Sequence, residues 1–307
     1  MLPLEIQKEI NDFFEDIKVY GYNYEFTELS DLRSKENYDN IIKNLSDITL
    51  PNPTALKFST MSLEELVSIL GEILIKIFGS NYKERIETYN SLLKLVPIEN
   101  PFEAMVESII VNGEQVPKHV YISDQCKSIQ IVSTGHEYIH CMLSKYDSNG
   151  FNDRINNVHY KELLSILIEY IICYELSKIL RDEKLQEKHE LIRIHHDKDQ
   201  ALERIECLSL IPQLVKLHPL DAMSLHSYIK YQEHNSFSYI LSNIYALYLL
   251  DAYKEEPTKL MSMITAIIDK DQCIRDLLEY FNLSLENQDV IKKYNLVMKN
   301  VSKTLHL

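Results

Sequence analysis

Glycine, cysteine and basic residues are all scarce in this 307-residue chain, and each scarcity excludes a class of function. The six glycines are scattered, so no spacing approaches a phosphate-binding loop or a dinucleotide fingerprint. The five cysteines lie far apart without a C-x-x-C pair, which argues against a disulfide framework and a cysteine zinc site. The chain has 32 basic and 46 acidic residues, and the resulting net charge of −14 argues against nucleic acid or an anionic membrane as a partner.

Long uninterrupted apolar runs are also missing. Residues 1–18 mix acids with apolar residues and lack a basic start and a small-residue cleavage site, so they predict no signal peptide. The most apolar stretches, 163–180 and 237–250, are interrupted by polar side chains and predict no membrane span. We therefore expect a cytoplasmic protein, and a dedicated export route remains the alternative.

What the chain does have is helical periodicity. Apolar residues recur at three- and four-residue spacing through most of the sequence, and the clearest run extends from Leu63 to Ile77. Ser62 precedes that run as a capping residue, and Pro219 and Pro257 stand where two further helices can begin. With 45% hydrophobic residues, the chain is predicted to be a mainly α, multi-helix protein.

One region departs from this pattern. Residues 116–123 are rich in β-branched and aromatic side chains, and residues 128–132 follow with a similar composition. Together they predict a short strand or hairpin. The two prolines within 97–101 predict a junction, which divides the chain into an N-terminal helical lobe, 1–100, and a second lobe, 101–307. The two lobes can also form one continuous domain.

Directly after the predicted strands, His136, Glu137 and His140 form an H-E-x-x-H pattern. Residues four apart share one face of a helix, so both imidazoles can bind one zinc ion while Glu137 reaches the water on it. The alternative is a helix face without function, because a chain with this many histidines contains the pattern by chance roughly a few times in a hundred.

The next helix strengthens the metal hypothesis. Residues 162–173 are almost wholly apolar apart from Glu162 and Glu169, which lie two turns apart on one face. A buried carboxylate is costly unless it is paired or binds a metal. Glu162 lies 22 positions beyond His140, which leaves room for a second helix to return alongside the first. Two histidines and one glutamate with an open fourth position form a catalytic zinc arrangement.

These residues resemble the thimet oligopeptidase and oligoendopeptidase F family of zinc metallopeptidases, a gluzincin type in which H-E-x-x-H is followed by E-x-x-S-x-x-x-E. Glu162, Ser165 and Glu169 occupy the defined positions of that second element. The resemblance implies one Zn²⁺ per chain, with His136, His140 and Glu162 as ligands and Glu169 orienting a ligand histidine. It also implies that the strand before the motif, 116–123, is an edge strand beside the zinc-binding helix and pairs with an extended peptide.

The family further places a histidine and tyrosines from a later helix over the metal. His234 and Tyr239 reproduce its H-x-x-x-x-Y spacing, and the resemblance implies that they stabilise the oxyanion. At the family's later tyrosine positions this chain carries Asn243 and Ala246, with Tyr245 nearby. Tyrosines at helical spacing can equally form an amphipathic core edge.

A further segment, Arg181 to Arg204, carries mixed charges and includes His195 and His196. Its composition predicts a solvated helix face more readily than a second metal site. We therefore assign these two histidines no function.

The expected function is that of a zinc metallopeptidase of the oligopeptidase or endopeptidase type, in a shortened form of the family. Its substrates would be short peptides or an extended segment of a specific protein target, and one narrower version is a delivered effector toxin. The oligomeric state stays open. Two alternatives are a catalytically silent helical protein that binds zinc or a peptide, and a zinc hydrolase of a non-peptide substrate. The intact Glu137 favours catalysis, because a structural zinc site needs no general base.

Overall fold

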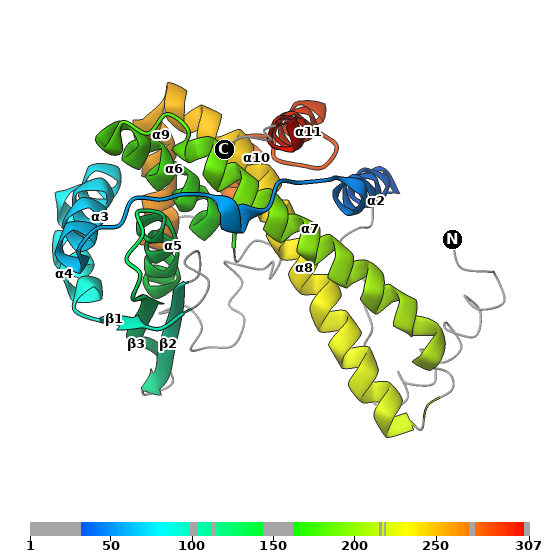
Figure 1. The fold of residues 1–307 in the computed structure, drawn as a ribbon. Helices are drawn as coiled ribbons and strands as arrows, with labels where there is room; N and C mark the ends of the chain where they lie inside the picture. Colours follow the sequence, from blue (N-terminus) through cyan, green and yellow to red (C-terminus); the bar gives the residue numbers. More distant parts are fainter. Residues whose placement is uncertain are drawn as a thin grey trace.

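The computed structural model describes residues 32–98, 104–111, 114–143, 162–214, 217, 219–269 and 274–303. Over these residues the chain is mainly helical, with a small sheet beneath one end of a helical bundle (Figure 1). The mainly α fold class with a small β element, predicted from the sequence, is confirmed.

The helices and strands follow one another along the chain as α2 (Leu32–Asp47), α3 (Leu63–Phe78), α4 (Lys83–Asn90), β1 (Leu93–Val96), β2 (Ala104–Val111), β3 (Glu114–Ser123), α5 (Gln130–Leu143), α6 (Leu163–Leu180), α7 (Leu185–Leu214), α8 (Pro219–Glu255), α9 (Pro257–Ile268), α10 (Ile274–Tyr280) and α11 (Gln288–Lys303). Short 3-10 turns at Pro53–Ala55 and Ser80–Tyr82 flank α3 on either side. Helices α8 and α9 begin at the two prolines that marked predicted helix starts.

Helix α3 shows how local sequence determines an element here. The Ser62 hydroxyl accepts a hydrogen bond from the Glu65 amide at 3.1 Å, and the Glu65 carboxylate accepts one from the Ser62 amide at 2.8 Å. This reciprocal capping box satisfies amide donors that have no partner within the first turn. The buried face of the helix then carries the periodic apolar residues, including Leu66, Leu70 and Ile77.

The sheet has the strand order β1-β3-β2. Strand β1 pairs parallel to β3, with Leu93 opposite Val120, and β2 pairs antiparallel to β3, with Ala104 opposite Ile122. The strand predicted at 116–123 is therefore confirmed, but it lies in the middle of the sheet. Among the described strands, β1 and β2 form the edges.

The second predicted strand, residues 128–132, is wrong, because these residues turn into the start of α5. The Gln130 side chain causes the turn: its Oε1 accepts from the Lys127 amide at 2.6 Å, and its Nε2 donates to the Ser123 carbonyl at 3.0 Å. An apolar run this short does not show enough periodicity to distinguish a strand from the start of a buried helix.

Helix α6 forms the centre of the bundle. It packs against α5, α7, α8 and α3, and nearly every residue from Leu163 to Leu176 is buried. Helix α5 lies between α6 and the sheet, so its two faces are both covered (Figure 1). This arrangement brings the H-E-x-x-H segment against the carboxylates of α6.

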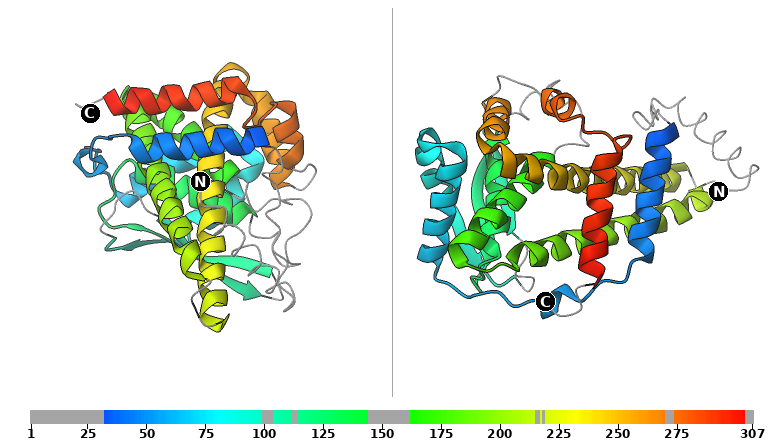
Figure 2. Two further views of the ribbon diagram at one scale, coloured as in Figure 1. Left: turned by 90° about the vertical axis from the view of Figure 1, so that its right-hand side faces the viewer. Right: turned by 90° about the horizontal axis from the view of Figure 1, so that it is seen from above.

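The long helices α7 and α8 form an antiparallel hairpin whose far end projects from the bundle (Figure 1). Helices α2 and α11 lie across this hairpin side by side, although they come from opposite ends of the chain (Figure 2). None of the helices in the described ranges is long and apolar enough to cross a membrane. The division into lobes 1–100 and 101–307 stays a prediction.

Gly135 permits the close packing of α5 on α6. A Cβ atom at this position would lie 2.0 Å from the Ile172 Cδ1 methyl, closer than any non-bonded contact allows. Gly135 is therefore a point of close approach between α6 and the helix that carries the H-E-x-x-H segment.

We predict that Gly135→Ala destabilises the wild-type protein by about 1–2 kcal/mol, because overpacking outweighs the helix propensity of alanine. In an Ile172→Val background, which lacks the Cδ1 methyl, the same change should be neutral or stabilising. Urea unfolding of the four proteins of this double-mutant cycle measures the coupling. Equal effects of Gly135→Ala in both backgrounds would contradict the proposed contact.

Candidate metal centre

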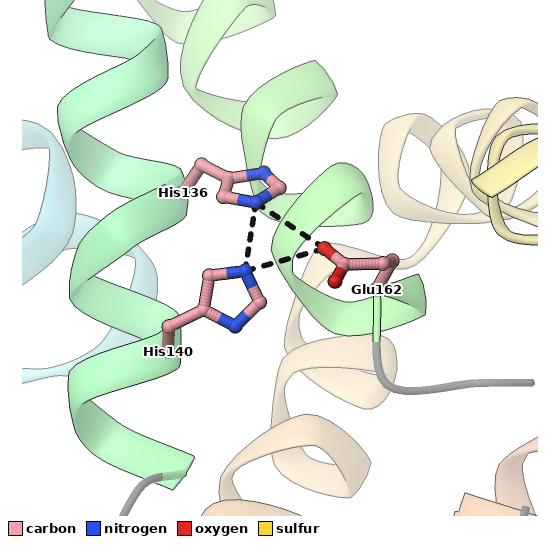
Figure 3. A group of neighbouring side chains, drawn as sticks. All are labelled: His136, His140 and Glu162. Atoms are coloured by element: carbon pink, nitrogen blue, oxygen red, sulfur yellow. Dashed lines mark hydrogen bonds and ion pairs between the residues drawn. The ribbon is translucent and has the colours of Figure 1, made fainter. Parts of the chain in front are cut away.

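His136, His140 and Glu162 converge on one point between α5 and the start of α6 (Figure 3). The two Nε2 atoms are 2.8 Å apart, and the Glu162 Oε2 atom lies 3.4 Å from that of His136 and 3.2 Å from that of His140. The histidines come from successive turns of α5, and Glu162 is the residue at which α6 begins. The structure thus brings together the three residues predicted as metal ligands.

The spacing of these three atoms fits a single metal ion. Ligands about 2.1 Å from an ion at tetrahedral angles are separated by about 3.4 Å. The observed separations of 2.8 to 3.4 Å lie near that value. Imidazole nitrogen and carboxylate oxygen are also the donor types that zinc accepts.

The centre is buried on one side and open on the other. The Glu162 side chain is 4% exposed and that of His136 10%, whereas His140 keeps 31% of its surface in contact with solvent. His140 is therefore the residue of the cluster with the greatest contact with solvent. A catalytic zinc site keeps one coordination position for water or substrate, whereas a structural site is closed by four protein ligands.

Glu169 holds the His136 ring from the side opposite the ligand atoms. Its Oε1 atom lies 2.6 Å from His136 Nδ1, and its Oε2 atom lies 3.1 Å from His189 Nε2. With Nδ1 facing a carboxylate, Nε2 remains as the nitrogen that faces Glu162 and His140. That Glu169 orients a ligand histidine, as the family resemblance implied, stays a prediction.

The charges of the cluster favour a cation at its centre. Burial opposes protonation of His136, but the carboxylates of Glu169 and Glu162 outweigh it and raise the pKa of His136 to about 10. Burial likewise opposes ionisation of Glu162, and hydrogen bonds to the two imidazoles reverse this and lower the pKa of Glu162. Buried carboxylates that stay ionised need positive partners.

Helix α7 supplies the remaining partners of Glu169, which the sequence did not predict. The His189 and Arg193 side chains lie against Glu169, with the Arg193 Nε atom 3.7 Å from its Oε2. Arg193 and His136 hold the pKa of the Glu169 carboxyl well below its usual range against the effect of burial. The prediction that Arg181–Arg204 forms a solvated face is therefore wrong for one side of α7, where His189, Arg193, Asp197, Gln200 and Arg204 are buried.

A second buried network continues from this side of α7. The Asn243 side chain accepts a hydrogen bond from the Tyr170 hydroxyl at 2.7 Å and donates one to Asp197 at 2.5 Å. The Tyr294 hydroxyl donates to the same Asp197 oxygen at 2.6 Å. Asn243 thus links α8 to α6 and α7 inside the core, and Asp197 extends the network to α11.

Glu137 lies on the same helix as the two ligand histidines and is half-buried. Burial raises the pKa of its carboxyl, and the electrostatic effect of the neighbouring His136 and His140 side chains opposes the rise. A raised pKa moves a carboxylate towards the range in which it exchanges protons near neutral pH.

Tyr239 and His196 pack together beside the centre, with their ring centroids 4.8 Å apart and nearly perpendicular. Burial and the negative charge of Glu162 raise the pKa of Tyr239, so its hydroxyl stays protonated and can donate a hydrogen bond. His196, to which the sequence assigned no function, is thus a neighbour of the centre. His234 lies on α8, but its side chain is outside the part that the structure describes, and its role stays a prediction.

The structure predicts an acid-sensitive contribution from His196. Burial and the charge of Arg193 lower its pKa to about 3, below the value of about 6.5 in an unfolded chain. The unfolded state therefore binds the proton more readily, and this residue favours unfolding as the pH falls below about 6.5. We predict that His196→Gln removes this loss of folding stability, which is roughly 1–2 kcal/mol at pH 5.

Urea unfolding of metal-free protein between pH 7 and pH 5 measures this effect. The free energy of unfolding should fall less steeply for His196→Gln than for the wild type. A constant difference between the two proteins across the range would show that the imidazole of His196 protonates equally well in the folded state.

Comparison with known proteins shows the fold. No protein-family model and no curated protein matches this chain. The crystal structure of a putative oligoendopeptidase F from Bacillus anthracis strain Ames matches with a TM-score of 0.56 and 13% identity over 98% of this chain and 59% of that chain. A putative peptidase from Chlamydophila abortus matches with a TM-score of 0.48 and 13% identity over 99% and 56% of the two chains. The chain thus spans less than two thirds of either protein, and it has the fold of the first one.

Proposed function

We propose that this chain is a zinc-dependent metallopeptidase that hydrolyses peptide bonds in short peptides or in an extended segment of a protein. The observation that carries the proposal is the convergence of His136, His140 and Glu162 beside Glu137, within the fold of an oligoendopeptidase F. In this proposal the three converging residues hold one zinc ion. When bound, a zinc ion acidifies water at its open position and polarises a carbonyl oxygen there.

Glu137 is the proposed general base. Its carboxylate accepts the proton of the attacking water and then delivers that proton to the leaving amine, so no net proton is lost. The burial that raises its pKa favours acceptance of the proton, which the carboxyl then holds until the leaving amine takes it. Tyr239, whose hydroxyl stays protonated, would donate a hydrogen bond to the oxygen that gains negative charge.

Strand β2 is the proposed guide for the substrate backbone. It packs on α5 and, within the described part of the sheet, pairs with β3 on one side only. An extended peptide can add to such an edge through main-chain hydrogen bonds, which require no particular side chains. The edge strand implied by the family resemblance thus corresponds to β2 rather than to β3.

Glu137→Gln tests the base. The amide cannot accept the proton, and we predict that hydrolysis falls by a factor of about 10² to 10⁴ while the zinc content stays the same. Cleavage of a random-sequence peptide library, followed by mass spectrometry with and without chelator, measures the activity, and elemental analysis measures the zinc. The control is Glu84→Gln, the same change at an exposed position of α4.

Two results would contradict the proposal. Turnover by zinc-loaded Glu137→Gln at the wild-type rate would remove Glu137 from the role of base. A zinc-loaded wild type without chelator-sensitive cleavage of the library or of a protein substrate would favour the alternative of a silent binding protein.

Glu169→Gln tests the positioning of His136. The amide keeps the shape but loses the charge, and we predict a zinc affinity that is about ten- to a hundredfold weaker. Glu175→Gln is the matched control, because Glu175 lies on the same helix with 6% of its side chain exposed, but pairs with lysines. Competition with a chromophoric chelator measures both affinities. If the two variants bind zinc equally well, Glu169 does not position the ligand.

A further inference from the structure

A cavity of about 630 Å³ lies at the other end of α6 from the metal centre. Thirteen residues of helix separate Glu162 from Glu175, which corresponds to roughly 20 Å along the axis. The walls of the cavity come from the ends of α3, α6 and α8 and from α9, which gather at one side of the bundle (Figure 1). Its volume falls within the range of cavities that hold small organic molecules.

Glu175 lines this cavity and is itself held in place. Its carboxylate accepts hydrogen bonds from Lys76 at 2.5 Å, from Lys178 at 3.2 Å and from the Tyr253 hydroxyl at 3.1 Å. Although the side chain is buried, the two lysines lower the pKa of Glu175, so it stays ionised. The carboxylate therefore fixes two ammonium groups at the mouth of the cavity.

Positive charge exceeds negative charge along the walls. The lining residues include Lys76, Lys178 and Lys254, and Glu175 is the acidic group among them. Lys178 and Lys254 both lie over the Tyr174 ring, 3.6 Å and 5.2 Å from its centroid. Two positive charges thus remain after Glu175 is neutralised, in a chain whose net charge is −14.

Apolar surface completes the cavity. Phe78 and Met261 line it and are both buried, and Thr258 and Ser262 add hydroxyl groups at the rim. A few fixed polar groups above an apolar floor are typical of a site for a small molecule. Glu175 pairs with Lys76 and Lys178, and Lys254 lines the same cavity without a second carboxylate among the lining residues to pair with it.

From these contacts we propose that the cavity binds a small organic anion with an apolar body, either a phosphate monoester or a carboxylate. The anionic head would lie between Lys178 and Lys254, and the apolar part would contact Met261 and Phe78. Charge-assisted hydrogen bonds to fixed ammonium groups are the strong contacts of such a site. This second site is independent of the proposed peptidase activity.

Isothermal titration calorimetry with phenyl phosphate, benzoate and phenol tests the proposal on the full chain. Phenyl phosphate or benzoate should bind with a one-to-one stoichiometry, and the better of the two identifies the head group. Neutral phenol should bind at least about tenfold more weakly, because it makes no charge-assisted contact. Lys254→Gln and Lys178→Gln should each weaken the anion about tenfold.

Two controls separate this site from others. Lys292→Gln removes an exposed lysine of α11, 73% of whose side chain is in solvent, and should leave binding unchanged. Glu162→Gln disrupts the metal centre and should also leave anion binding intact. The proposal is overturned if neither anion binds, if phenol binds equally well, if Lys254→Gln behaves like Lys292→Gln, or if Glu162→Gln alone abolishes binding.

Discussion

The fold depends on the pairing of three carboxylates within an apolar helix. Glu169 and Glu175 lie on α6, and Glu162 is the residue directly before it. Each of the three is at most 7% exposed. An ionised carboxylate with so little contact with water is tolerated only beside positive or hydrogen-bonding partners. Those partners come from four other helices: α5 for Glu162, α5 and α7 for Glu169, and α3 and α8 for Glu175. The helices of the bundle therefore have to pack in a way that also pairs these charges.

The two ends of α6 meet that requirement in opposite ways. At Glu162 the partners are imidazoles, which are metal ligands once deprotonated, so His136, His140 and Glu162 offer the donor atoms of the proposed metal centre. At Glu175 the partners are lysines that outnumber the carboxylate, so the cavity attracts an anion. One helix thus carries a proposed metal centre and a proposed anion site. The distance between them lets either be altered without touching the other.

Sequence predicted the parts of this arrangement that depend on local spacing. Helix α3 with its Ser62 cap and the cluster of His136, His140 and Glu162 follow from residues close together in the chain. The buried side of α7 was not predictable from the sequence. Arg193 is neutralised by a residue of another helix, and in the sequence such a row of polar residues looks the same as a solvent-exposed face. Segment 128–132 was misassigned because a single side chain, Gln130, decided between strand and helix.

Anomalous diffraction at the zinc absorption edge, from crystals of protein with stoichiometric zinc, tests the central claim most directly. The account predicts one strong peak about 2.0–2.2 Å from the Nε2 atoms of His136 and His140 and from a carboxylate oxygen of Glu162. It also predicts that Glu169 still contacts His136 Nδ1 in those crystals. A zinc peak at another position, with these three side chains uncoordinated, would contradict it.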